Sequence, residues 1–228
     1  MDISIIIPTW NEEENIAFLI DRINNDLTRN LKYEIIIVDG GSSDNTIKLA
    51  NERNVKLILT QKGRGNQLCT GAKEANGEIL YFLHADSIPP PGFLNLIMQE
   101  IENGAEVGCF QLKFTPSNLI LRFYEFFVGY PYLLFRGGDQ SLFITRKLYA
   151  KIDGFNKNLK FMEDIDLLKR VNKVAKLRIL KERILTSSRK YSSNGVIRLQ
   201  LIFGVMHTLF WLNYSPEKIE SFYYKTVV

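Results

Sequence analysis

Hydrophobic runs of about five residues alternate with amphipathic stripes along the first hundred positions of the chain. Ile, Val and Leu fill the runs, as in strands that are buried on both faces of a sheet. The stripes place apolar residues three or four positions apart, which indicates helices with one buried face. Strands alternating with helices favour a parallel sheet with right-handed crossovers. We predict strands at 3–7, 34–38, 55–59 and 79–83, and helices at 12–27, 44–53, 65–75 and 91–102.

The second half of the chain is less regular but extends the same α/β class. We predict strands at 107–114, 141–145 and 177–185, and helices at 163–175 and 196–212. Ser215 as N-cap and Pro216 in the first turn mark a last helix. The aromatic segment 123–135 fits neither period and is left unassigned. We therefore expect one α/β domain at 1–190, with a helical extension at 191–228 packed on it.

Composition and charge add one local feature to this picture. The 228 residues are 46% hydrophobic and carry a net charge of +4. Nine Lys or Arg lie between positions 169 and 190, with Glu182 as the one acid. This basic stretch favours phosphate groups or an anionic membrane as a neighbour, or else it is a solvated helix face and a guarded strand edge. Cys69 and Cys109 have no metal or redox spacing, and the lack of a leader pattern predicts a cytoplasmic location.

Polar and charged residues follow each strand of the first half. Ligands of open parallel sheets bind beyond the carboxyl ends of the strands, so this edge predicts a nucleotide site. The glycine pattern of dinucleotide folds and the Walker loop are both absent from the chain, which disfavours NAD and a P-loop nucleotide. If the fourth strand continues, alternation of faces points His84 and Asp86 the same way, toward a divalent cation. The strand ends carry, in order, Asn11 and Glu12, Asp39 and Asp44, Lys62 and Arg64, and His84 and Asp86.

Three segments together resemble the inverting glycosyltransferases of family 2, which have the GT-A fold: 5–12 (IIIPTWNE), 38–46 (VDGGSSDNT) and 84–86 (HAD). The resemblance covers roughly residues 1–190. It implies a Rossmann-like, mostly parallel mixed sheet flanked by helices. It also implies metal-assisted transfer of a sugar from a nucleotide-sugar donor, with a UDP-sugar favoured, to an acceptor hydroxyl. The residues that it places along the nucleotide are Pro8, Asn11, Glu12, Asp39, Asp44, His84 and Ala85.

Two further contacts to the donor follow from charge. Lys62 and Arg64 bracket a glycine just before a predicted helix N-terminus, where anions bind, so we predict that they contact the nucleotide or its phosphates. A solvated turn is the alternative. For Asp39 and Asp44 the alternative is helix capping.

The resemblance also implies a cofactor. Asp86 matches the metal-binding end of the family's Asp-x-Asp motif, so Mn²⁺ or Mg²⁺ is expected there. His84 stands where aspartate is commoner, as in a subgroup with His-Ala-Asp that the chain resembles. Hard cations prefer oxygen ligands, so we expect His84 to contact the nucleotide or to support the site. A histidine that merely fills the core is the alternative.

Acids at a helix start supply the base that an inverting transfer needs. Neighbouring helical residues diverge, so Glu163, Asp164 and Asp166 cannot all face one cleft. By the resemblance Asp164 is the general base and Glu163 contacts the acceptor, which leaves Asp166 on the helix exterior. The alternative is that these acids only offset the helix dipole. Asp139 and Gln140 either bind sugar or acceptor hydroxyls or form a hairpin turn.

The segment 199–212 (LQLIFGVMHTLFWL) is apolar almost all round but shorter than the roughly 20 residues that span a bilayer. An interfacial helix over 196–214 would suit a lipid-linked acceptor and a peripheral position on the inner face of the membrane. A packing helix or a homodimer interface is the alternative, and no nucleic-acid partner is expected. We expect Arg189 and Lys190 to contact the diphosphate of the donor. The alternative functions are a nucleotidyltransferase, whose glycine-rich loop is missing, and a non-catalytic sugar-nucleotide-binding protein.

Overall fold

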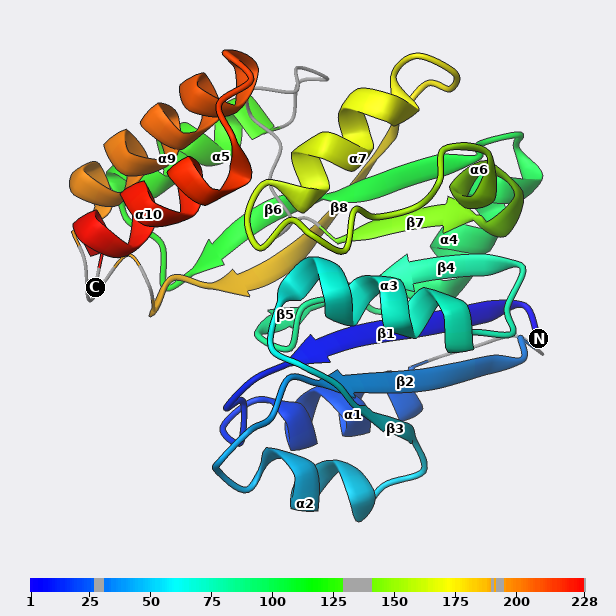
Figure 1. Cartoon of the computed structure of the whole chain (residues 1–228). Coiled ribbons are helices and arrows are strands. Elements are labelled where there is room, and N and C mark those ends of the chain that lie inside the picture. Colours follow the sequence, from blue (N-terminus) through cyan, green and yellow to red (C-terminus); the bar gives the residue numbers. More distant parts are fainter. Residues whose placement is uncertain (27–30, 129–140, 190, 192–194, 228) are drawn as a thin grey trace.

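The computed structural model describes residues 1–26, 31–128, 141–189, 191 and 195–227. Figure 1 shows one curled sheet with helices on both faces. The sheet has eight strands among these residues, in the order β3-β2-β1-β4-β7-β6-β8-β5. This arrangement confirms the predicted mixed α/β architecture.

The first four long strands form the parallel half of the sheet. Strand β1 (Ile3–Thr9) lies between β2 (Tyr33–Asp39) and β4 (Ile79–Phe82), and β3 (Lys56–Leu59) pairs with β2 at the edge. The buried, β-branched residues of β1 and β2 make these two strands the continuous apolar runs of the sequence, whereas β3 at the edge is partly exposed.

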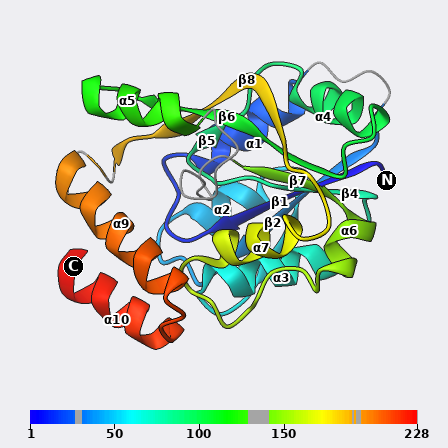
Figure 2. The ribbon, with the colours of Figure 1, turned by 90° about the horizontal axis from the view of Figure 1, so that it is seen from above.

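Alternation along β1 builds two cores. Ile3, Ile5 and Ile7 pack with α1 (Ile16–Asn24), α2 (Thr46–Asn51) and α4 (Phe93–Glu102). Ile6 faces the other way, toward α3 (Arg64–Glu74), α6 (Arg146–Lys151) and α7 (Glu163–Val171). Figure 2 shows the sheet between these two layers of helices.

The other half of the sheet is mixed. Strand β7 (Leu142–Thr145) is antiparallel to β4 and to β6 (Val107–Thr115), whereas β8 (Arg178–Ser187) runs parallel to β6. A two-residue strand, β5 (Ser87–Ile88), completes the sheet on β8.

Several predicted bounds were wrong. Neither β5 nor α6 was predicted, because two and six residues are too short to display a period. The helix predicted from position 91 begins at Phe93, after Gly92, which is in the left-handed region. Part of the unassigned aromatic segment forms α5 (Leu119–Val128).

The C-terminal helices cover the start of α7. Helix α9 (Val196–Trp211) and α10 (Pro216–Val227) lie side by side, and they contribute Ile202, Met206 and Ile219 to a small core. Met162 and Ile165 of the α7 start complete this core. None of the helices in the described ranges is long and apolar enough to cross a membrane.

Candidate functional site

The carboxyl ends of the parallel strands meet at one edge, as predicted. Thr9 at the end of β1 is in register with Asp39 at the end of β2, and Asp39 is in register with Leu59 of β3. Pro8 pairs with Val38 one position earlier. The polar loops after β1 and β2 therefore start side by side.

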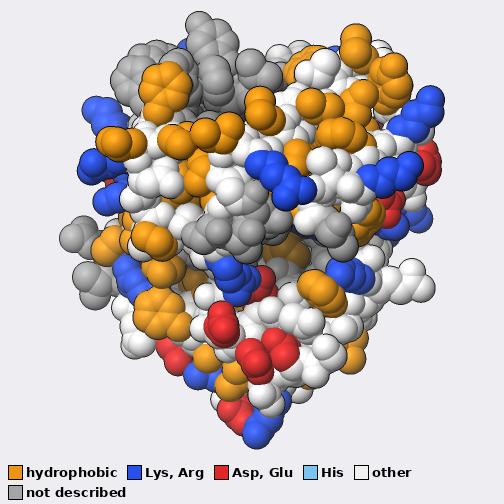
Figure 3. Space-filling view, turned by 90° about the vertical axis from the view of Figure 1, so that its left-hand side faces the viewer, with side chains coloured by type: hydrophobic (Ala, Val, Ile, Leu, Met, Phe, Trp, Pro, Cys, Tyr) orange, Lys and Arg blue, Asp and Glu red, His pale blue; other side chains and the backbone are white. Residues whose placement is uncertain are grey.

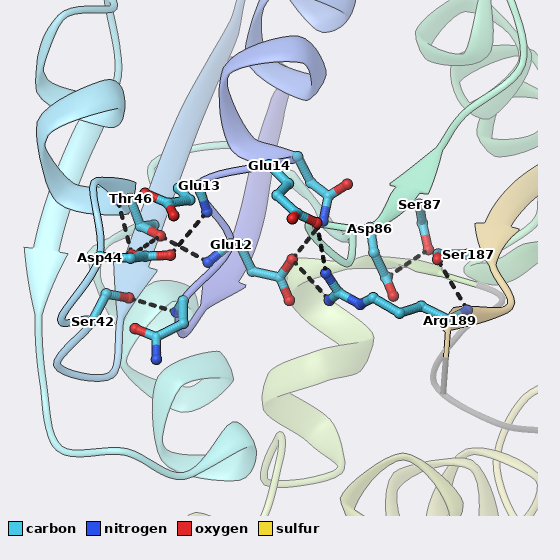
Figure 4. A network of polar contacts seen from close by, with 12 residues as sticks. Glu12, Glu13, Glu14, Ser42, Asp44, Thr46, Asp86, Ser87, Ser187 and Arg189 are labelled. Carbon is cyan, nitrogen blue, oxygen red and sulfur yellow. Dashed lines mark hydrogen bonds and ion pairs between the residues drawn. The ribbon is translucent and has the colours of Figure 1, made fainter. Parts of the chain in front are cut away.

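Hydrogen bonds join these two loops along their length. The backbone N–H of Asn11 donates to Ser42 Oγ over 2.8 Å, and the N–H of Ser43 donates to Asn11 Oδ1 over 2.9 Å. The N–H of Glu12 donates to Thr46 Oγ1 over 2.7 Å (Figure 4). Asn11 has a φ of 53°, a left-handed conformation that asparagine tolerates better than most residues. The loops thus form one rigid wall of the site.

Asp39 organises this wall from inside. The residue is fully buried, and its carboxylate accepts four hydrogen bonds. The N–H groups of Gly41 and Ser42 donate to Oδ1, while Thr9 Oγ1 and Ser42 Oγ donate to Oδ2. A carboxylate is the group that can accept this many bonds at once. The predicted contact of Asp39 with the base stays a prediction.

Asp44 joins the first turn of α2 to the β1–α1 loop. Its Oδ1 accepts bonds from the N–H and Oγ1 of Thr46, and its Oδ2 accepts the N–H of Glu13 over 3.1 Å. Desolvation would raise the pKa of Asp44, but these hydrogen bonds outweigh it and hold the pKa below its ordinary value. Asp44 therefore caps the start of α2, as the alternative interpretation expected. Its position near the nucleotide stays a prediction.

Lys62 and Trp10 form the outer rim. The Lys62 ammonium lies 3.0 Å from the centroid of the Trp10 ring, a cation–π contact between two exposed side chains. Desolvation lowers the pKa of Lys62. An aromatic ring beside a cation at the end of β1 offers a surface for a flat, anionic ligand.

Arg64 contacts two other predicted site residues, His84 and Glu163, which are distant from it in the sequence. Its Nη2 lies 2.6 Å from His84 Nε2, and its Nε lies 2.8 Å from Glu163 Oε1. A guanidinium can only donate, so His84 Nε2 is the acceptor and its proton is on Nδ1. The Glu163 side chain is only 3% exposed. Arg64 thus ties α3, the end of β4 and the start of α7 together below the nucleotide edge.

The prediction that His84 and Asp86 point the same way assumed that the fourth strand continues through them, and this assumption was wrong. Strand β4 ends at Phe82, and both residues lie in a turn closed by the bond from Ser87 N–H to the His84 carbonyl. Strand alternation does not apply there. His84 turns to Arg64, while Asp86 lies on the side of β8, where its carbonyl accepts the N–H of Ser187. Ala85 between them is buried.

Arg189 crosses from the end of β8 to the opposite wall. Its guanidinium lies 3.5 Å from Glu12 Oε2 and 3.3 Å from Glu14 Oε2. Figure 4 shows Arg189 extending past Asp86 toward both glutamates. The basic stretch was the only sequence sign of this contact. Arg189 thus places a cation beside the acids at this edge of the sheet.

Asp164 lies at the first turn of α7, half-buried, and accepts the N–H of Ile165 over 2.8 Å. Asp166, two positions further along the helix, is partly buried and pairs with Arg170 over 2.6 Å. Sequence reasoning missed His207 of α9, whose buried Nδ1 has no hydrogen-bond partner among the described residues. Burial lowers the pKa of His207, and nearby Asp164 opposes the shift. Asp164 is thus close enough to His207, across the α7–α9 junction, to influence the pKa of the imidazole.

Three predicted residues cannot be placed. Asp139, Gln140 and Lys190 lie outside the described residues. Within the described ranges, no cluster of three or more His, Cys, Asp or Glu side chains could hold a metal ion.

The chain is similar in sequence to known glycosyltransferases. The model of the family described as "Glycosyl transferase family 2" matches residues 4–156. The "Dolichol-phosphate mannosyltransferase" of Pyrococcus furiosus is 38% identical over 114 residues, which are 47% of this chain and 32% of that protein. This chain thus spans about a third of the length of that curated relative.

Two solved structures share the fold at low identity. TarS of S. aureus in complex with UDP has a TM-score of 0.68 and 18% identity, over 97% of this chain and 69% of that one. The mannosyltransferase PcManGT of Pyrobaculum calidifontis, in complex with GDP-Man and Mn²⁺, has a TM-score of 0.70 and 17% identity. That match covers 93% of this chain and 64% of that one.

Proposed function

Because this chain belongs to glycosyl transferase family 2 and has the GT-A fold, we propose that it is an inverting transferase that uses a UDP-sugar. The observation that carries the proposal is the convergence of Asp39, Arg64, Asp86 and Asp164 on one edge of the sheet and the helices beside it. Residues 1–190 would form the transferase domain and 191–228 the appended helices.

The donor would lie across the strand ends. The nucleoside would rest on the wall of the β1–α1 and β2–α2 loops, beside the Trp10 ring. Lys62, Arg64 and Arg189 supply cations to the diphosphate, and each can exchange a present partner for phosphate oxygens. The wall residues that we assign to nucleotide binding are Pro8, Asn11, Glu12, Asp39, Asp44, His84 and Ala85.

A divalent cation fits this site if Asp86 is its protein ligand. The Nε2 of His84 is engaged by Arg64 and its Nδ1 carries the proton, so His84 is not a ligand in this arrangement. Mg²⁺ characteristically uses one or two carboxylates together with substrate phosphates and water, which matches a single aspartate. When bound, Mn²⁺ or Mg²⁺ would neutralise charge on the leaving diphosphate. Because residues 84–86 are His-Ala-Asp, we assign the chain to the subgroup with that motif.

Asp164 would be the general base. The acceptor oxygen forms a bond to the anomeric carbon while the bond from that carbon to the diphosphate breaks, and the acceptor proton passes to the Asp164 carboxylate. Asp164 is partly open at the start of α7, whereas Glu163 is buried against Arg64. Glu163 is therefore assigned to holding the site together rather than to the acceptor contact first predicted.

We further propose that the acceptor is carried by a lipid and that the enzyme works at the inner face of a membrane. The Pyrococcus furiosus relative is named for a lipid phosphate, dolichol phosphate, and the apolar segment 196–214 suits a membrane surface. A homodimer through the same segment is the competing arrangement.

The test separates donor binding from transfer. Thermal-shift screening of UDP-, GDP- and dTDP-sugars with Mn²⁺ identifies the donor, and the Asp86→Ala variant should lose the Mn²⁺-dependent part of the shift. Asp164→Asn should keep donor binding and lose transfer by 100-fold or more, the scale of a general base. Asp166→Asn, two positions along the same helix and paired with Arg170, is the matched control and should keep transfer. Loss of donor binding in Asp164→Asn, or binding without turnover in the parent, contradicts the proposal.

A further inference from the structure

Two helices far apart in the sequence expose large apolar side chains. On α5, Leu119 is 82% exposed and Phe123 is 68% exposed. On α9, Ile197 is 62% and Leu201 is 67% exposed, and Val205 is exposed as well. Positions 197, 201 and 205 are four apart and therefore share one face of the helix.

The opposite face of α9 is already in the protein core. Leu199, Ile202 and Met206 are buried. A helix that is apolar all round is normally covered all round. Here only one side is covered by the rest of the described chain, although the sequence of α9 lacks a polar stripe. The outer apolar stripe of α9 is therefore available to be buried by a binding partner.

The two exposed stripes lie on neighbouring helices, because α5 and α9 contact each other directly. We call them together the α5–α9 surface and define it by Leu119, Ile120, Phe123, Ile197, Leu201 and Val205. Figure 3 shows hydrophobic side chains mixed with Lys and Arg across the upper part of the face that carries these helices. Most acidic side chains in that view lie below this region or at its right edge. Apolar exposure on two touching helices marks a candidate interaction surface.

The charges next to the surface are cationic. The only charged residue of α9 is Arg198, and α5 contains Arg122 and Glu125. Both arginines are exposed, whereas Glu125 accepts bonds from Phe114 N–H and Ser117 Oγ at the base of α5. Apolar side chains rimmed by arginines are the pattern of a surface that binds anionic lipid.

We propose that the α5–α9 surface docks on an anionic lipid bilayer. A symmetric dimer through the same surface would bring each arginine rim against its own copy, which disfavours a second chain as the occupant. The 16 residues of α9 span about 24 Å, less than the hydrocarbon core of a bilayer, so the helix lies on the membrane rather than across it.

This orientation deepens the proposed function, on which the following step rests. Met206 on the buried face of α9 packs with Met162 and Ile165, on either side of Asp164. The membrane-facing stripe and the wall beside the candidate base are thus two faces of one helix. A lipid-linked acceptor reaches Asp164 around the edge of α9 without leaving the bilayer surface.

Vesicle flotation tests the proposal directly. The parent chain should bind vesicles of phosphatidylcholine with 30% phosphatidylglycerol, and a Phe123→Gln/Leu201→Gln variant should bind them at least tenfold more weakly. Both side chains are exposed, so the variant should melt at the parent temperature. Phe18→Gln, which removes an exposed phenylalanine from α1, is the matched control and should bind like the parent. Arg122→Gln/Arg198→Gln should reduce the preference for the anionic vesicles.

The outcomes separate this proposal from the proposed function. Absence of vesicle binding by the parent, or equal binding by the Phe123→Gln/Leu201→Gln variant, overturns the docking surface even if sugar transfer is observed. Concentration-dependent dimers that this variant abolishes overturn it in favour of a second copy. Binding that behaves as expected, together with a chain that transfers no sugar to any acceptor, leaves the surface in place and overturns the enzyme assignment instead.

Discussion

Replacing Arg64 by methionine tests the bridge that holds the site together. The change removes the cation beside Glu163 and keeps a long apolar stem. The Glu163 side chain is 3% exposed and that of Arg64 is 32% exposed, so the variant leaves the less hydrated partner without its ion pair. Breaking a buried pair costs about 3 to 5 kcal/mol, and the partial exposure of Arg64 reduces this to about 2 to 3 kcal/mol. For a chain of this size, Tm should fall by about 4 to 12 °C.

The two single variants of the Arg64–Glu163 ion pair should lose different amounts of stability. Glu163→Gln leaves Arg64, which still reaches water and His84, so this variant should lose less stability than Arg64→Met. The double variant has no buried charge at this place and should regain much of the loss. Urea unfolding at pH 7, followed by circular dichroism, measures all three free energies of unfolding.

Arg53→Met is the matched surface control. Arg53 makes two hydrogen bonds to Asp21, but the Asp21 side chain is 54% exposed, so the loss should stay below about 1 kcal/mol. The reasoning is refuted if Arg64→Met costs no more than Arg53→Met. It is also refuted if the Arg64 and Glu163 variants are equally costly and their effects add in the double variant.

Three further predictions concern packing, pH and the loop wall. Gly65→Ala would place a methyl group 2.5 Å from the Leu159 carbonyl oxygen, so it should cost about 1 to 3 kcal/mol in urea unfolding, whereas Gly204→Ala, with open space around it, should cost nothing; equal effects would contradict this. Burial lowers the pKa of His207, so as pH falls the unfolded chain binds a proton at this histidine before the folded chain does. The free energy of unfolding is therefore unaffected above about pH 6.5 and decreases as the pH falls through the lowered pKa. Melting curves from pH 7.5 to 5 should therefore show less acid sensitivity in His207→Gln, and parallel curves would refute this. Asp39→Asn turns an amide toward four donors, so it should cost about 2 to 3 kcal/mol and weaken nucleotide binding; a variant as stable as the parent would show that the carboxylate is not needed.

Much of the parallel half could be predicted from the sequence. A strand that is buried on both faces must be apolar throughout, so the runs at 3–7 and 34–38 identified β1 and β2 directly. Parallel strands end at a common edge, so Asp39 and Asp44 could be placed near Asn11 before any contact was known. The same logic failed at His84, because a strand period says nothing about where the strand stops.

Several parts of the site depend on contacts that no local pattern encodes. Arg64 and Glu163 each had a plausible separate role as single residues, and only the packing of α7 against α3 and β4 made them an ion pair. His207 looked like one polar residue in an apolar helix until α9 was found against the start of α7.

The sequence by itself determined the alternation of the longer strands and helices in the first half of the chain and the residue types that follow those strands, because periodicity and turn chemistry act over a few neighbouring positions. The tertiary structure decided that β7, β6, β8 and β5 extend the sheet in that spatial order, and that Arg64 meets Glu163. It also decided that the outer stripe of α9 stays exposed beside α5. The physical reason is that burial and ion pairing depend on which distant segments pack together, and many arrangements satisfy the same local pattern.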